Sequence, residues 1–210
     1  QRILFTINKL HSTKFHGIEL LKSSHPGIRR LRRKHGNPTH HGNKIWRSSL
    51  IMMDYLCDHP PHNNAQVLDI GCGWGAVSTL LAKNFCANVT ALDIDPLMEK
   101  IVDLHCDLNE CGVNFTNRNL YTLNCDELEQ FELIVATDIC FWDSTLKENF
   151  KLIQFAIDAD CPRILIADPG RPPFWNLVDL CAERFSAEVL SRAIHHHYKT
   201  WGYVLKISIN

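Results

Sequence analysis

The strongest constraint on the fold is a regular alternation of short apolar runs and helix-like segments, which starts near residue 66 and continues to the C-terminus. Short apolar runs bounded by turn residues are typical of buried strands, whereas apolar residues spaced three and four positions apart are typical of helices. Strict alternation requires crossover connections, which give a mostly parallel sheet with helices on both faces. The sequence therefore predicts a doubly wound α/β fold.

Seven strands and five helices are expected. The predicted strands cover residues 66–70, 88–94, 112–117, 131–138, 162–168, 187–194 and 203–209. The predicted helices cover residues 46–57, 75–85, 96–111, 144–159 and 172–185. No helical pattern separates the last two strands, so these two are expected to pair antiparallel. The expected sheet is thus seven-stranded and Rossmann-like, with an antiparallel C-terminal strand pair.

The charge is divided unevenly along the chain. Residues 1–47 contain eleven of the 22 Lys and Arg but a single acid, Glu19, although the net charge of the whole chain is −1. We expect an N-terminal basic arm and helix over residues 1–60 and one further domain over residues 61–210. Such an arm can contact nucleic acid or an acidic protein. Because it lacks the interleaved aromatic residues that stack on bases, folding back onto the acidic body is favoured.

Several classes of protein are disfavoured. No apolar run approaches the roughly 18 residues of a membrane span, and the first residues do not resemble a signal peptide, so a cytoplasmic location without membrane contact is expected. Nine cysteines without a C-x-x-C pair indicate reduced thiols. The tract His195–His197 lies where a turn is predicted, and neighbouring strand residues point in opposite directions. No metal site is therefore expected.

A glycine-rich turn follows the first predicted strand of the sheet. The stretch VLDIGCGWG, residues 67–75, places Gly71, Gly73 and Gly75 between that strand and a helix. Glycines at this position allow a sharp turn and close approach of a ligand, although a tight turn without a ligand is the simpler alternative. The next strand ends in Asp93, where a carboxylate can accept hydrogen bonds from a ribose. Asp95 competes for that role, but its place before Pro96 suits a helix cap better.

These residues resemble the first motif of the class I S-adenosylmethionine-dependent methyltransferases, an acid followed by G-x-G-x-G, rather than the G-x-G-x-x-G of dinucleotide-binding proteins. The resemblance implies S-adenosylmethionine as cofactor and S-adenosylhomocysteine as product. It implies that the three glycines pass the methionine part, that Asp69 meets its ammonium group and that Asp93 binds the ribose. It also implies Asp126 near the adenine amine, with Asn124, Cys125 and a plain surface turn as rivals.

The acceptor side is expected at the end of the strand in LIVATDICFWD, residues 133–143. A carboxylate at a buried strand end, Asp138, is costly unless it is used. The stretch lacks the Pro-Pro that follows Asp or Asn in amine-directed nucleic-acid enzymes, and Cys161-Pro162 reverses the order of pyrimidine C5 enzymes. The pattern Asp-x-x-Phe instead resembles the seven-β-strand protein lysine methyltransferases.

The stretch GNKIW (42–46) resembles an element that precedes the first motif in the same family. Three more stretches, ALDIDP (91–96), CDLN (106–109) and ILIADPGRPPF (164–174), resemble the protein lysine methyltransferases of the electron-transfer-flavoprotein β-subunit type. The resemblance implies that Asp138 serves the acceptor lysine. Phe141 and Trp142 are expected to form part of an apolar channel beside it, with core packing as the alternative for Phe141. Trp46 is expected over the cofactor or in packing of the arm. Arg171 either contacts an acidic protein surface or fixes its own loop.

The sequence thus favours methyl transfer to a protein lysine. A small-molecule or nucleic-acid N- or O-methyltransferase is the runner-up, and the basic arm is the main argument for nucleic acid. A module that binds the cofactor without turnover is less favoured, because such a module has no use for Asp138. The expected partner is a protein substrate. The sequence does not indicate an oligomeric state.

Overall fold

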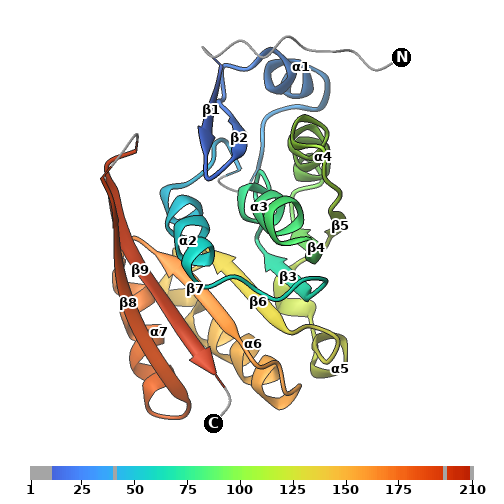
Figure 1. Ribbon diagram of the computed structural model, residues 1–210. Coiled ribbons are helices and arrows are strands. Elements are labelled where there is room, and N and C mark those ends of the chain that lie inside the picture. The colour runs from blue at the N-terminus through green and yellow to red at the C-terminus, as the bar shows by residue number, and fades with distance from the viewer. Residues whose placement is uncertain (1–10, 40–41, 196–197, 209–210) are drawn as a thin grey trace.

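A seven-stranded sheet forms the centre of the computed structural model, which describes residues 11–39, 42–195 and 198–208 (Figure 1). The strand order is β5-β4-β3-β6-β7-β9-β8. The first five of these are parallel, and β9 pairs antiparallel with both β7 and β8. The strands are β3 (Gln66–Ile70), β4 (Asn88–Asp93), β5 (Asn114–Asn117), β6 (Leu133–Thr137), β7 (Ile164–Asp168), β8 (Ser186–Ile194) and β9 (Thr200–Ser208). The predicted fold class and its antiparallel C-terminal pair are confirmed.

Helices cover both faces of the sheet (Figure 1). On one face lie α2 (Arg47–Asp58), α3 (Ala76–Phe85) and α4 (Leu97–Asn109); on the other lie α5 (Cys125–Leu128), α6 (Leu146–Asp158) and α7 (Pro172–Ala182). Short 3₁₀ turns, η1 (Leu120–Thr122) and η2 (Asp143–Thr145), precede α5 and α6. In β6, Leu133 and Val135 belong to the core between the sheet and helices α2 and α3. Ile134 and Ala136 belong to the core between the sheet and helices α6 and α7. Burial on both faces explains why the strand is apolar without alternation.

The N-terminal arm differs from the predicted helical arm, because a hairpin precedes its helix. The hairpin consists of β1 (Ser12–Phe15) and β2 (Ile18–Leu21), and the helix is α1 (Pro26–His35). The turn residues His16 and Gly17 have φ of 44° and 83°, as a two-residue hairpin turn requires. Each of these strands has four residues, and apolar and polar residues do not alternate regularly over such a short stretch. Their strand conformation therefore depends on tertiary packing and not on a local sequence pattern.

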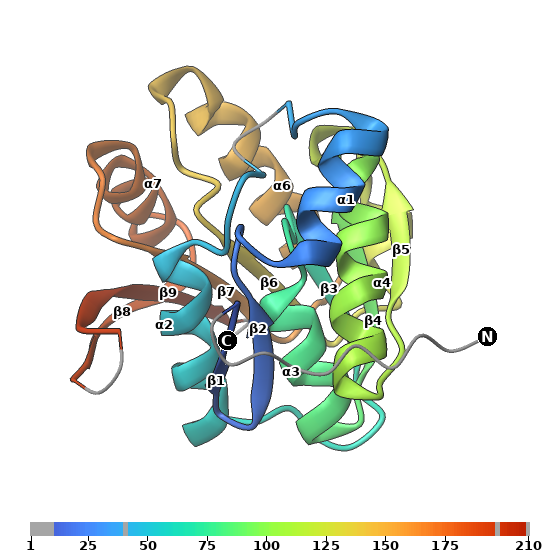
Figure 2. The same ribbon diagram turned by 90° about the horizontal axis from the view of Figure 1, so that it is seen from above.

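The described part of the arm lies on the body of the chain, with the hairpin against α2, α3 and α4 and with α1 alongside α4 (Figure 2). The contact is apolar: Ile28 of α1 is fully buried with Met98 and Ile101 of α4. The basic side chains at 29, 30, 33 and 34 are exposed on the outer side of α1. The arm thus folds back as favoured from the sequence, but through hydrophobic packing.

Polar side chains of α4 fix the edge of the hairpin. His105 Nε2 accepts the backbone N–H of Leu21 at 3.0 Å, and burial lowers the pKa of His105 to about 4. Asn109 accepts the N–H of Glu19 at 2.8 Å and donates to its carbonyl at 3.0 Å. These bonds satisfy backbone groups that a two-stranded hairpin leaves unpaired.

The structure also bears on the predictions about cysteines, membrane spans, metal sites and the histidine tract. All nine cysteines are free thiols. None of the helices in the described ranges is long and apolar enough to cross a membrane. Within those ranges no group of three metal-binding side chains occurs. The expected turn at His195–His197 falls largely outside the described residues, since His196 and His197 are among those left undescribed.

Candidate active site

The loop between β3 and α3 turns through three glycines with left-handed backbones. Gly71, Gly73 and Gly75 have φ of 65°, 53° and 73°. A Cβ at Gly75 would lie 2.8 Å from Val102 of α4, so this glycine permits packing of α3 on α4. A Cβ at Gly73 would meet nothing within 4 Å. The loop therefore leaves open space at its middle glycine, where a ligand can approach the backbone.

Asp93, at the end of β4, faces this loop. Its two carboxylate oxygens accept backbone N–H groups of Gly73 and Asp95, each at 2.9 Å. The rival Asp95 is buried and accepts the N–H of Leu97 at the start of α4, as well as that of Thr39. The structure thus gives Asp95 the helix-start role expected for it and leaves Asp93 at the glycine loop.

Asp69 lies beneath the loop. The residue is 1% exposed, and Ser78 Oγ of α3 donates to its Oδ2 at 2.5 Å. Burial raises the pKa of Asp69 to about 6. This geometry attaches β3 to α3 from inside the protein, and the predicted contact of Asp69 with an ammonium group stays a prediction.

Asp126 is less closely connected to the loop. It is exposed in the first turn of α5, and Asn124 is used as the N-cap of that helix, where it accepts the N–H of Glu127. The residues that follow β5 lie nearer to Asp93, because Arg118 donates its backbone N–H to the Asp93 carbonyl at 3.0 Å. Asn119 comes next and caps η1. No sequence signal marks Asn119, because the short polar strand β5 gives no clear end point.

Asp138 comes directly after β6 with φ of 57°, and its N–H donates to the Ala167 carbonyl at 3.0 Å. A non-glycine residue in the left-handed region is strained and is frequently found at functional sites. The Asp138 side chain is 7% exposed, and its Oδ2 is buried with no hydrogen-bond partner among the described residues. The neighbouring Ile139 lies close to Gly71, since a Cβ at Gly71 would be 3.4 Å from Ile139 Cγ2. The segment that contains Asp138 is therefore next to the glycine loop.

Arg171 connects the ends of β6 and β7. Its Nη1 lies 2.7 Å from Asp138 Oδ1 and 2.7 Å from Asp168 Oδ2. Its guanidinium carbon lies 4.1 Å from the ring centre of Phe141. Burial raises the pKa of Asp168, whose other oxygen accepts the N–H groups of Gly170 and Arg171. Of the two roles expected for Arg171, the structure shows that it fixes its own loop.

Aromatic side chains surround this cluster. The rings of Trp46 and Phe141 meet edge to face at 5.6 Å, so Trp46 lies beside the acceptor motif. Trp142 is 58% exposed next to Phe141. Cys140 is buried, and burial raises the pKa of its thiol, so it is a packing residue. The placement of Phe141 and Trp142 near a substrate stays a prediction.

A cleft of about 550 Å³ opens beside Asp138. It lies between the hairpin, the start of α2 and the loop after β7. Its lining includes two of the predicted site residues, Trp46 and Asp138, as well as Arg171. Lys44, Arg47 and the hairpin also line it, and no local sequence pattern indicates that these segments come together.

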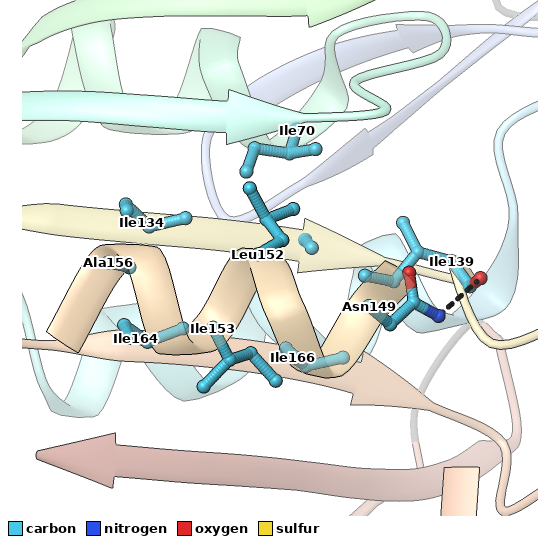
Figure 3. A pocket seen from close by; sticks show the side chains of 10 residues that line it. Ile70, Ile134, Ile139, Asn149, Leu152, Ile153, Ala156, Ile164 and Ile166 are labelled. Carbon is cyan, nitrogen blue, oxygen red and sulfur yellow. Dashed lines mark hydrogen bonds between the residues drawn. The ribbon is translucent and has the colours of Figure 1, made fainter. Parts of the chain in front are cut away.

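A second, much smaller cavity lies on the other face, between the strands and α6 (Figure 3). Its volume is about 10 Å³, and branched apolar side chains such as Ile70, Ile134 and Ile166 line it. Asn149, at its edge, donates to the Ile139 carbonyl at 3.4 Å (Figure 3). A space of this size holds at most one water, so it is a packing defect and not a ligand site.

Comparison with known proteins agrees with this geometry. A family model described as a methyltransferase domain matches residues 67–154. The electron transfer flavoprotein beta subunit lysine methyltransferase of Rattus norvegicus is 35% identical over 132 residues, which cover 61% of this chain and 50% of that protein. A ubiquinone biosynthesis O-methyltransferase of Xylella fastidiosa is 30% identical over 89 residues, covering 42% of this chain and 36% of that one. The chain spans about half the length of the first of these relatives.

Solved structures show the same fold at low sequence identity. The ribosomal protein L11 methylase of Lactobacillus delbrueckii aligns with a TM-score of 0.60 and 16% identity, covering 84% of this chain and 83% of that chain. A tRNA (uracil-54, C5)-methyltransferase of Pyrococcus abyssi, solved with S-adenosylhomocysteine, aligns with a TM-score of 0.58 and 12% identity over 93% and 43% of the two chains. The family match and these neighbours support S-adenosylmethionine as the cofactor. The chain therefore matches a methyltransferase domain over residues 67–154 and has the fold of the class I S-adenosylmethionine-dependent methyltransferases.

Proposed function

We propose that this protein transfers a methyl group from S-adenosylmethionine to the side-chain amine of a protein lysine. The observation that carries the proposal is Asp138: Oδ1 pairs with Arg171, whereas Oδ2 is buried without a partner among the described residues. An unsatisfied buried carboxylate oxygen costs free energy, and an N–H donor from a substrate amine would satisfy it. The lysine methyltransferases among the curated relatives support this choice of acceptor.

The residues of the glycine loop fit the cofactor. Gly73 borders open space, and Asp93, whose oxygens accept two backbone N–H groups at this loop, is a residue type that accepts hydrogen bonds from a ribose. Ile94 follows Asp93 and is 44% exposed, which offers an apolar surface to a purine ring. Asn119, beside the Asp93 loop, is better placed than Asp126 to meet the edge of that ring. When bound, S-adenosylmethionine supplies an electrophilic methyl whose sulfonium leaves as a neutral thioether.

Asp138 positions the acceptor amine. Arg171 fixes the carboxylate through Oδ1, so that Oδ2 can accept an N–H from the amine and direct its lone pair towards the methyl. A carboxylate also favours the charged form of a lysine, which opposes loss of its proton. The proton released on transfer therefore passes to Asp138 or to water, and the aromatic surroundings of Phe141 tolerate the cationic product.

Transfer to a small molecule is the second candidate. The O-methyltransferase relative and a cleft volume within the range of small-ligand sites favour it. Exposed aromatic residues favour a macromolecule instead: Trp175 and Trp201 are 37% and 62% exposed, and both pack against Tyr203 beside the loop after β7. Exposed tryptophans close to a site are typical of protein interfaces.

The test is methyl transfer to the proteins of a cell lysate, with labelled S-adenosylmethionine. The full chain should label a protein band on lysine, and Asp138→Ala should abolish the label while S-adenosylhomocysteine binding by calorimetry persists. Asp143→Ala is the matched control, because Asp143 is exposed and its side chain accepts a hydrogen bond from the exposed residue Asn176 at 3.3 Å. Label found solely in nucleic acid or in the small-molecule fraction would contradict a lysine acceptor.

A further inference from the structure

The cleft beside Asp138 is basic. Its charged lining residues are Lys22, Lys44, Arg47 and Arg171, with Asp138 as the one acid among the described lining residues. Asp138 and Arg171 pair with each other. The excess positive charge of the cleft therefore lies on the side formed by the hairpin and by the segment that leads into α2.

The start of α2 adds to this positive region. Arg47 is the first residue of the helix, and the N-cap residue Trp46 gives no side-chain cap hydrogen bond. The first turn contains no acidic residue. Both Lys44 and Arg47 are exposed, and Lys44 Nζ lies 4.6 Å from the Trp46 ring centre. The positive end of a helix dipole combined with two exposed cations attracts carboxylates.

The two ends of the cleft thus require opposite chemistry from one ligand. At one end the buried Asp138 Oδ2 requires a hydrogen-bond donor. At the other end Lys44, Arg47 and the start of α2 favour an anion. A lysine with acidic residues beside it in the chain offers both groups within the length of a short peptide segment.

From this juxtaposition we infer that the substrate segment is acidic, with Asp or Glu residues flanking the acceptor lysine and binding Lys44, Arg47 and the start of α2. The inference rests on the proposed lysine transfer and adds the class of segment that is recognised.

The experiment uses two synthetic peptides with a single lysine each, one flanked by Asp and Glu and the other by Asn and Gln at the same positions. With the full chain and S-adenosylmethionine, kcat/KM should be at least about tenfold higher for the acidic peptide at low salt, and the difference should shrink as salt increases. The double variant Lys44→Glu/Arg47→Glu should remove this preference and leave S-adenosylhomocysteine affinity unchanged.

The matched control is Arg33→Glu/Lys34→Glu, which reverses two exposed charges on α1 outside the cleft lining. Equal rates for the two peptides, or an equal effect of the two double variants, would overturn the acidic segment while lysine transfer stands. If lysate proteins are methylated on lysine but neither peptide is methylated, the proposal of an acidic segment is also overturned. If lysine is labelled in no peptide and no lysate protein, the proposed function fails, and the acidic segment fails with it.

Discussion

Asp69 and Asp93 lie at the ends of β3 and β4, and Asp138 and Asp168 lie at the ends of β6 and β7, yet the two pairs are held by different groups. Asp93 accepts backbone N–H groups on both oxygens, and Asp69 accepts a hydroxyl. Asp138 and Asp168 instead share the guanidinium of Arg171. The proposed cofactor half, at the ends of β3 and β4, is thus held by backbone N–H groups and one hydroxyl. The proposed acceptor half, at the ends of β6 and β7, also uses backbone N–H groups but adds one guanidinium that joins the two strands.

Removing Arg171 tests the acceptor half and should have the largest effect. Arg171→Met leaves Asp138 and Asp168 buried without their cation, which should lower the free energy of unfolding by about 4 kcal/mol. Urea unfolding at neutral pH measures this loss. Arg163→Met is the control, since the Arg163 side chain contacts a backbone carbonyl, that of His59, and the ring of Tyr55, and it binds no carboxylate in the described structure. Equal losses for the two variants would show that the acceptor half does not depend on the shared guanidinium.

A branched side chain in the glycine loop tests the cofactor half. Gly73→Val should weaken S-adenosylhomocysteine binding about 100-fold in calorimetry, because valine is strained at a φ of 53° and fills the open space of the loop. Gly36→Val is the matched control: Gly36 also has a positive φ, 89°, and open space around a Cβ, but it follows α1. Unchanged affinity in Gly73→Val would move the cofactor away from this loop.

The pH dependence of stability tests Asp69 at the end of β3, and its expected effect is the smallest of the three. The folded pKa of Asp69, about 6, lies above its ordinary value of 3.8, so the folded chain binds more protons between these values. The stability that this group contributes is therefore present below pH 3.8 and is lost as the pH rises through 6. Asp69→Asn removes that loss. The free energy of unfolding of the variant, relative to that of the wild type, should therefore rise by about 2 kcal/mol between pH 4 and pH 8.

Denaturant unfolding of both proteins across this range gives the difference directly. His105 contributes with the opposite sign, because its folded pKa of about 4 lies below 6.5, but it is common to both proteins and cancels in the difference. A constant difference across the range would mean that Asp69 is not desolvated in the folded state.

The cofactor half was predictable because its geometry is local. Glycines at 71, 73 and 75, placed between an apolar run and a helical pattern, specify a strand, a left-handed turn and a helix within ten residues. The parallel sheet follows from the alternation of strand and helix patterns, and the antiparallel ending follows from the missing helical pattern between the last two strands. The confirmed fold class therefore rests on signals that each occupy a short window of sequence.

The acceptor half was predictable only at Asp138 itself. Its pairing with Arg171 joins residues 33 positions apart, and the cleft adds Lys44, Arg47 and a hairpin whose strands have four residues each. Local propensity does not specify such contacts, because tertiary packing decides them. The role of Asp126 stays a prediction, and the residue beside Asp93 after β5 is fixed by strand pairing rather than by a motif.

The bonds from α4 to the hairpin have a consequence for the order of folding. Leu21 and Glu19 pair with His105 and Asn109, which follow 84 and 90 residues later in the chain. During synthesis β2 is made early, but its outer backbone groups have no partner until α4 has emerged. Closing so long a loop carries an entropic cost that only docked structure repays. The hairpin side of the cleft is therefore completed only after β3, α3 and β4 have been made. A chain that stalls before residue 105 would expose the unpaired edge of the hairpin to other chains.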